Sequence, residues 1–136
     1  GHGFTGAGHP VGAAIALENI GIIEERDLVA NAAETGAYMQ EQLRGLSDHP
    51  IVGEGRGIGL IAAVELVIDK AAKTGLEKPG ALGAAASARL LDNGVISRAM
   101  MDALAFCPPM IVSRADIDGM VLALRTSLDE TTAALG

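Results

Sequence analysis

Residues 51–67 contain the feature that most constrains the fold, a series of alternating glycines that leads into a short apolar segment. Four glycines occupy every second position of residues 53–59, and LIAAVELV follows at residues 60–67. A short apolar run rich in branched side chains is typical of a buried strand. The order therefore predicts an antiparallel hairpin that turns near Gly57 to Gly59. A dinucleotide-binding loop would instead need these glycines between a strand and a helix.

Glu65 is the one charged residue of that apolar segment. A buried carboxylate needs a partner, because an unpaired charge is costly to remove from water. Arg56 lies on the opposite arm of the predicted hairpin. We therefore expect a structural ion pair between Arg56 and Glu65 rather than a catalytic role for either residue.

The segment before the hairpin is expected to be helical from Pro10 to about Leu46, in two parts separated near residues 24–27. Proline is favourable at the first position of a helix, and alanines and leucine follow it. Apolar or small residues recur at helical spacing in the second part, at Leu28, Ala32, Thr35, Met39 and Leu43. Tyr38 and Met39 are expected to pack in or beside the core.

After the hairpin, residues 69–79 form a polar loop that contains every lysine of the chain. We expect a helix over residues 80–93, stopped by a glycine at position 94, and strands within residues 95–107. The expected strands are Val95–Arg98 and Ala103–Cys107. Ser113 with Asp116 resembles a capping box and predicts the start of a final helix over residues 114–133.

Composition excludes several classes of function. A net charge of −7 and 2% aromatic residues argue against nucleic-acid binding and against anionic membranes. No apolar stretch is long enough to span a membrane, and no metal site is predicted. A single cysteine, Cys107, excludes an intrachain disulfide and is compatible with the cytoplasm. The chain begins inside a glycine loop without Met, so we expect it to be a piece of a longer protein.

Two places are candidates for binding. The glycine-rich loop at residues 1–9 runs into a helix N-terminus, where backbone N–H groups can hold an anion, and Thr5 adds a hydroxyl group. Arg98 has the planar guanidinium group that suits a carboxylate or phosphate, and an ordinary surface arginine is the alternative. Cys107 has apolar neighbours and is not predicted to be a nucleophile. The lysines at positions 70, 73 and 78 are expected to be solvated surface.

Three motifs together resemble the class III pyridoxal-phosphate aminotransferases, and within them the omega-amino acid:pyruvate type. HGFTGAGHPVGAAIAL at residues 2–17 resembles the family pattern H-G-[FY]-T-[YAS]-x-G-H-P. VGEGRGIGLIAAVELV at residues 52–67 resembles its R-G-x-G-L hairpin, and residues 98–118 resemble its ending with R-x-x-G and a Pro-Pro pair. The resemblance covers essentially the whole chain, with the motifs in the family's order.

The resemblance implies a function and a set of site residues. It implies that Thr5, helped by the backbone N–H of Phe4, binds the cofactor phosphate of the partner subunit in a homodimer or higher homo-oligomer. It implies that Arg98 is a mobile arginine, which binds the substrate carboxylate and swings away for amines that lack one. The lysine that forms the Schiff base would lie upstream of Gly1, so no catalytic residue is expected in this chain, and the fragment alone is expected to be inactive.

The resemblance also implies an α+β fold, in which helices pack on a small, mainly antiparallel sheet. Residues 1–46 would carry the phosphate loop and lead out of a large domain, and residues 47–136 would form the C-terminal small domain. The sequence departs from the family pattern at Met101, where glycine is usual, and at Gly6 and Ala7, which leave a barer loop. The alternatives are a non-catalytic assembly module or another class III enzyme, such as a decarboxylase, racemase or aminomutase.

Overall fold

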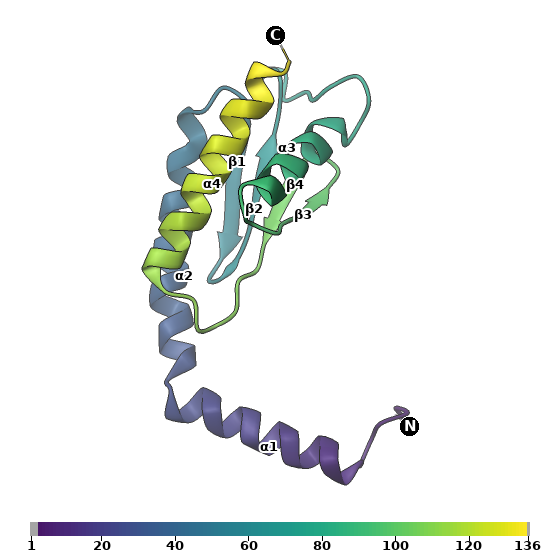
Figure 1. Cartoon of the computed structure of the whole chain (residues 1–136), viewed down its shortest axis with the longest axis vertical. Helices are drawn as coiled ribbons and strands as arrows, with labels where there is room; N and C mark the ends of the chain where they lie inside the picture. Colours follow the sequence, from purple (N-terminus) through teal and green to yellow (C-terminus); the bar gives the residue numbers. More distant parts are fainter. Residues whose placement is uncertain (1–2, 136) are drawn as a thin grey trace.

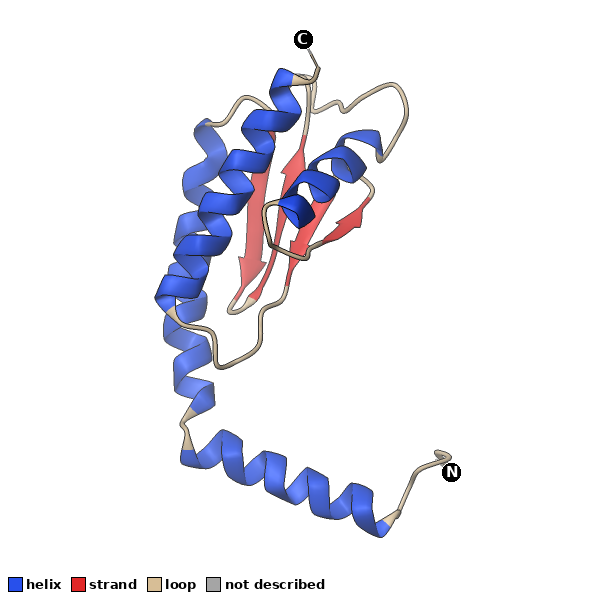
Figure 2. Ribbon diagram, viewed as in Figure 1, coloured by secondary structure: helices blue, strands red, loops and turns tan. Residues whose placement is uncertain are grey.

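The computed structural model describes residues 3–135, which form a four-stranded sheet with helices packed on one face (Figures 1 and 2). The elements follow in the order α1 (Pro10–Glu25), α2 (Leu28–Arg44), the 3₁₀ helix η1 (Gly45–Asp48), β1 (Val52–Ile58), β2 (Ile61–Leu66), α3 (Ala81–Asp92), β3 (Arg98–Met100), β4 (Ala103–Phe106) and α4 (Arg114–Ala133). Helices α2, α3 and α4 cover the sheet, whereas α1 extends away from it. The predicted α+β fold is confirmed.

The break between α1 and α2 falls where the charged residues predicted it. Asp27 adopts the left-handed backbone conformation, with φ of 47°. A residue in that conformation cannot continue a right-handed helix, so α1 ends before Asp27 and α2 starts after it. The carbonyl oxygen of Asp27 accepts a hydrogen bond from the backbone N–H of Asn31 at 3.0 Å, which begins the second helix.

The sheet has the strand order β1-β2-β4-β3, and every neighbouring pair is antiparallel. The predicted hairpin is confirmed as β1 and β2, and its turn lies at Gly59 and Leu60, between the paired residues Ile58 and Ile61. Gly59 has φ of 54°, a conformation that glycine adopts without strain. The turn is tied to α2, because the side-chain amide of Gln40 donates to the carbonyl oxygen of Gly59 at 2.8 Å.

Glycines allow the hairpin to pack closely against α2. A Cβ atom at Gly55 of β1 would lie 3.1 Å from the carbonyl oxygen of Leu43, and one at Gly36 of α2 would lie 2.6 Å from backbone atoms of Gly59. Side chains at these positions would push the helix away from the hairpin. Gly55 and Gly36 therefore serve the contact between helix and hairpin, in agreement with the hairpin interpretation and not with a dinucleotide loop.

The strand expected at Val95–Arg98 was placed wrongly, since β3 runs from Arg98 to Met100. The cause is the end of α3, which closes in a Schellman motif. The backbone N–H of Gly94 donates to the carbonyl oxygen of Leu91, and that of Val95 donates to Leu90. Gly94 and Val95 therefore end the helix, and Val95 does not start a strand. The second expected strand is confirmed as β4, which ends one residue earlier than predicted.

The core lies between the sheet and the three helices that cover it. The helices contribute apolar side chains at helical spacing, and β2 and β4 contribute every second residue. The largest fully buried side chains are Met39, Leu43, Leu46, Leu66, Leu82, Leu90, Leu104, Ile117, Leu124 and Leu128. Helix α4 has the predicted bounds, and its capping box is present, with the Ser113 hydroxyl accepting from the backbone N–H of Asp116.

Candidate substrate pocket and N-terminal loop

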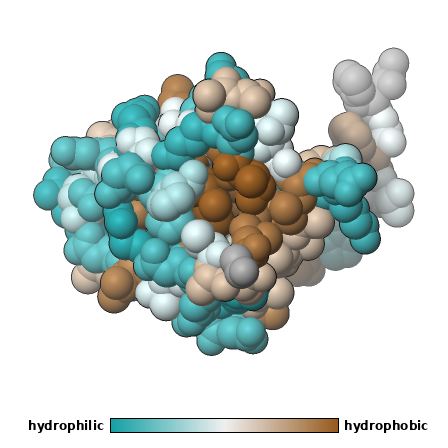
Figure 3. Space-filling model, turned by 90° about the horizontal axis from the view of Figure 1, so that it is seen from above, coloured by the Kyte–Doolittle hydropathy of each residue, from teal (hydrophilic) through white to brown (hydrophobic). Residues whose placement is uncertain are grey.

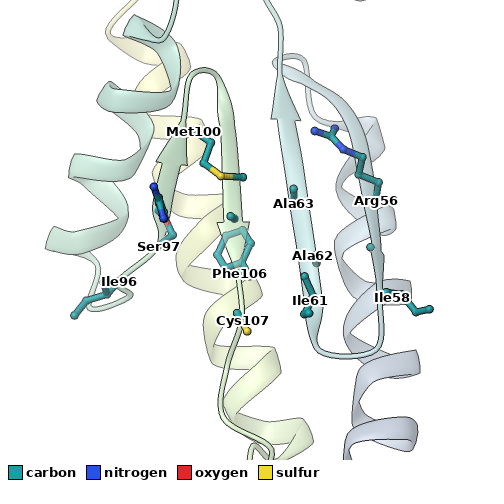
Figure 4. Close-up of a pocket in the computed structure, with 13 residues that line it drawn as sticks. Arg56, Ile58, Ile61, Ala62, Ala63, Ile96, Ser97, Met100, Phe106 and Cys107 are labelled. Atoms are coloured by element: carbon teal, nitrogen blue, oxygen red, sulfur yellow. The ribbon is translucent and has the colours of Figure 1, made fainter. Parts of the chain in front are cut away.

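The face of the sheet opposite the helices carries a pocket of about 640 Å³. Figure 4 views the sheet from this side, with side chains from β1, β2 and the β3–β4 hairpin around the hollow. Most of the lining is apolar. The lining residues are Arg56, Gly57, Ile58, Ile61, Ala62, Ala63, Ile96, Ser97, Arg98, Met100, Ala105, Phe106 and Cys107.

One row of paired residues crosses the whole sheet beneath this pocket. Arg56 pairs with Ala63, Ala63 with Ala105, and Ala105 with Arg98. Directly paired residues in adjacent strands project to the same face. The row therefore places a guanidinium group at each edge and two alanines in the middle. The small alanine side chains leave space on the sheet between the two cations.

The two arginines differ in their surroundings. Arg56 donates to the Glu65 carboxylate at 2.7 Å, so the predicted ion pair is confirmed, with both side chains partly exposed. Arg98 is exposed and has no side-chain partner within residues 3–135. Its positive charge is therefore available to a carboxylate or phosphate. Of the two cations beside the pocket, Arg98 is the one that can bind an anionic ligand without breaking an existing pair.

The sequence motifs did not reveal two polar groups of the β3–β4 region, Ser97 next to Arg98 and Asp102 at the other end of the hairpin. The Ser97 hydroxyl is buried and has no hydrogen-bond partner among the described residues. Asp102, at the tip of the β3–β4 hairpin, accepts from the backbone N–H groups of Gly80 and Gly83 at 3.1 and 2.9 Å. Asp102 acts through a contact between segments far apart in sequence, and no local pattern marks it. Cys107 is exposed beside the pocket.

The loop that contains Thr5 lies at the far end of α1 from the sheet (Figure 1), so the structure does not bring Thr5 and Arg98 together. The backbone N–H of Ala7 donates to the carbonyl oxygen of Phe4 at 2.9 Å, and Gly8 has φ of 74°. Pro10 then starts α1, and the N-cap residue His9 provides no side-chain hydrogen bond. The loop is a tight turn ahead of a helix N-terminus.

This loop fits one side of a phosphate group. Phe4 and Thr5 are exposed, and the Thr5 hydroxyl makes no hydrogen bond within residues 3–135. A hydroxyl group and turn N–H groups beside a helix N-terminus are suitable donors to an anion. The loop has no aromatic or cationic side chain besides Phe4 and the histidines, so it fits a phosphate edge rather than an entire cofactor.

The lysines are on the surface, as expected. Lys70, Lys73 and Lys78 are all exposed, and the Lys70 ammonium group donates to the carbonyl oxygen of Ser47 at 2.8 Å. A lysine that forms an imine normally lies in a water-poor pocket that lowers its pKa. These three side chains are instead exposed to water.

Helix α1 exposes apolar side chains on several sides. None of its residues is buried, and Val11, Ile15, Leu17 and Ile20 are each more than half exposed. A helix that is apolar all round is normally covered by protein. Apolar side chains also reach the surface at the end of the molecule where the chain terminates, as the brown area of Figure 3 shows. No helix within residues 3–135 combines the length and the apolar character that crossing a membrane requires.

Comparison with known proteins gives a consistent result. The family model described as "Aminotransferase class-III" matches residues 1–128. The putrescine–pyruvate aminotransferase of Pseudomonas aeruginosa is 42% identical over 98% of this chain and 29% of its own length. The diaminobutyrate–2-oxoglutarate transaminase of Halomonas elongata is also 42% identical, over 99% of this chain and 29% of its own length. The chain thus spans less than a third of these curated relatives.

Solved structures agree with the sequence relatives. A structure described as "Transaminase with L-ala" superposes with a TM-score of 0.96, at 64% identity over 100% of this chain and 32% of that chain. The omega transaminase of Pseudomonas jessenii in complex with PMP superposes with a TM-score of 0.92, at 50% identity over 98% of this chain and 29% of that chain. The described fold is therefore one part of a larger transaminase fold.

Proposed function

The chain belongs to the class III aminotransferase family, and from that premise we propose that it is the C-terminal part of a transaminase. The complete enzyme would move an amino group from an omega-amino acid or amine to pyruvate or another keto acid. The names of the two curated relatives each pair an amine with a keto acid, which supports this substrate class. Residues 47–136 would form its small domain, and residues 1–46 would lead out of its large domain.

The observation that carries the proposal is the position of Arg98 beside the pocket without a partner among the described residues. A guanidinium group can bind a carboxylate through two parallel hydrogen bonds. We propose that Arg98 binds the carboxylate of the keto acid or the omega-amino acid. The alanines at positions 63 and 105 leave room for the carbon chain of the substrate. A charge with no fixed partner can also turn away when the amine has no carboxylate.

The family uses pyridoxal 5′-phosphate, and Thr5 and Phe4 are the residues of this chain proposed to hold its phosphate. The Thr5 hydroxyl and the loop N–H groups would donate to phosphate oxygens, next to the positive end of α1. When bound, the cofactor supplies the electron sink for amino-group transfer, and the protein orients the reacting groups. The distance of this loop from the sheet supports a phosphate held by the partner subunit in a homodimer.

The chain of residues 1–136 alone is proposed to be inactive. Its three lysines are exposed in a polar loop and are poor candidates for an imine with the cofactor. The purified chain should therefore keep no absorbance band near the visible edge after it is mixed with pyridoxal phosphate and the free cofactor is removed by gel filtration. A stable band together with transamination would contradict the proposal.

The experiment that tests the role of Arg98 compares two amine donors in the complete enzyme. In the Arg98→Ala variant, the KM for 4-aminobutyrate should rise at least tenfold, because its carboxylate loses a charged partner, whereas the KM for butylamine should be unchanged. The amine half-reaction should be followed at the cofactor absorbance without keto acid, so that no second carboxylate is present; KM then denotes the donor concentration that gives half of the maximal single-turnover rate. Arg125→Ala is the matched control, since Arg125 lies on α4, outside the pocket, and is paired with Asp48. An unchanged KM for 4-aminobutyrate would refute the role.

A further inference from the structure

Asp102 joins three elements at the tip of the β3–β4 hairpin. Its carboxylate accepts from the backbone N–H groups of Gly80 and Gly83, at the start of α3. Its carbonyl oxygen accepts from the backbone N–H of Leu66, at the end of β2, at 2.9 Å. The N-cap residue of α3 is Gly80, which has no side chain to cap the helix. Asp102 therefore caps α3 from a distant part of the chain.

The two donors that Asp102 binds are the same two that a capping box satisfies, the N–H groups of the N-cap and of the third helical residue. Hydrogen bonds to a charged acceptor are stronger than bonds between neutral groups. The packing beside them is tight, because a Cβ atom at Gly83 would lie 2.1 Å from the carbonyl oxygen of Met101. The hairpin tip and the first turn of α3 are in direct backbone contact.

This attachment matters for Arg98 because β3 has little other support. The strand has three residues, lies at the edge of the sheet and pairs only with β4. Arg98 is its first residue, four positions before Asp102. Met101, between them, has φ of 55°, a conformation that costs energy for a residue with a side chain. We expect loss of the carboxylate bonds to let the strained turn relax and β3 shift with it.

We propose that Asp102 is a positioning residue for substrate binding. It fixes the β3–β4 hairpin on α3 and so determines where the Arg98 guanidinium lies beside the pocket. This inference rests on the proposed function in one respect, the binding of a substrate carboxylate by Arg98. It assigns Asp102 no contact with the substrate. Loss of the Asp102 carboxylate should therefore weaken the binding of substrates that have a carboxylate and spare those that lack one.

The test uses the complete enzyme and the two donors 4-aminobutyrate and butylamine, in the amine half-reaction. Asp102→Ala removes both hydrogen bonds, and Asp102→Asn keeps one amide oxygen as an acceptor. The KM for 4-aminobutyrate should rise at least fivefold in Asp102→Ala and less in Asp102→Asn, with the KM for butylamine unchanged in both. Asp48→Ala is the matched control, because it removes an exposed carboxylate from η1, outside the pocket.

The double variant Arg98→Ala/Asp102→Ala separates positioning from general damage. If Asp102 acts through Arg98, adding Asp102→Ala to Arg98→Ala should change the KM for 4-aminobutyrate by less than twofold. Equal losses for both donors, or effects of the two substitutions that multiply, would overturn the inference and leave the proposed function standing. A 4-aminobutyrate KM unaffected by Arg98→Ala would overturn both. If Asp102→Ala does not fold, the same comparisons with Asp102→Asn decide the question.

Discussion

Replacing a helical glycine by alanine should have opposite effects on the free energy of unfolding at two positions. It should lower this free energy at Gly83, where α3 contacts the β3–β4 hairpin, and raise it at Gly119, on α4. Gly83→Ala places a Cβ atom 2.1 Å from the Met101 carbonyl oxygen and 2.9 Å from the Asp102 Cα atom, so backbone must move. Gly119→Ala, in α4, meets nothing within 4 Å. Alanine favours a helix over glycine by about 1 kcal/mol, so the second variant should be stabilised by roughly that amount.

The loss of folding stability in Gly83→Ala follows from two effects. Overpacking at a tight contact costs about 1–3 kcal/mol. Displacing the helix also weakens the bond from the Gly83 N–H to the Asp102 carboxylate, a charged hydrogen bond worth about 1.5–3 kcal/mol. After subtraction of the helix preference of about 1 kcal/mol, the net loss should be about 1.5–5 kcal/mol.

Urea unfolding, monitored by circular dichroism, tests the Gly83→Ala and Gly119→Ala variants. The two variants should differ by about 2.5–6 kcal/mol, which separates their midpoints by about 1 M urea or more at a typical slope. Gly83→Ala should be less stable than the unsubstituted protein, and Gly119→Ala more stable. If both substitutions shift the midpoint in the same direction by similar amounts, the explanation from a tight contact between Gly83 and the hairpin is refuted.

Three further predictions concern single residues. Hydrogen bonds from Ser113 lower the pKa of Asp116. The ionised Asp116 should therefore stabilise the fold above the unfolded pKa of about 3.9, and this stabilisation should be lost as pH falls through the folded pKa. The difference in urea midpoint between Asp116→Ala and the unsubstituted protein should vanish at low pH. Ser97→Ala should raise stability by up to about 1 kcal/mol in thermal unfolding, because it removes a buried hydroxyl without a partner among the described residues. Thr5→Ala in the complete enzyme should speed the loss of pyridoxal phosphate during dialysis; unchanged retention would count against the phosphate role.

Local signals in the sequence were enough for the helices. Pro10, Ser113 and Gly94 each act on the residues beside them, and the helices that they delimit lie where predicted. The hairpin of β1 and β2 was also predictable, because a short run of branched residues directly after a glycine-rich turn is typical of paired strands. The bounds of α4 agree because its capping box is entirely local.

The errors and omissions have non-local causes. The first residues after α3 resemble a strand in composition, but the Schellman motif uses Val95 to close the helix. Asp102 could not be recognised, because its hydrogen-bond donors at Gly80 and Gly83 lie about twenty positions earlier in the chain. The open sheet face was likewise invisible to sequence patterns, since its row of arginines and alanines is assembled from four strands. The family motifs predict a substrate role for Arg98, and the fold places a pocket beside it.

The outer strands of the sheet carry a consequence for solubility. Within the described residues, β1 and β3 each have one side without a strand neighbour, and such edges can recruit strands of other molecules. The edge at β3 is protected by its three-residue length and by a charged first residue, Arg98. The charges of Glu54 and Arg56 protect β1 in the same way. Replacing Arg98 by an apolar residue therefore removes a barrier to aggregation at this edge.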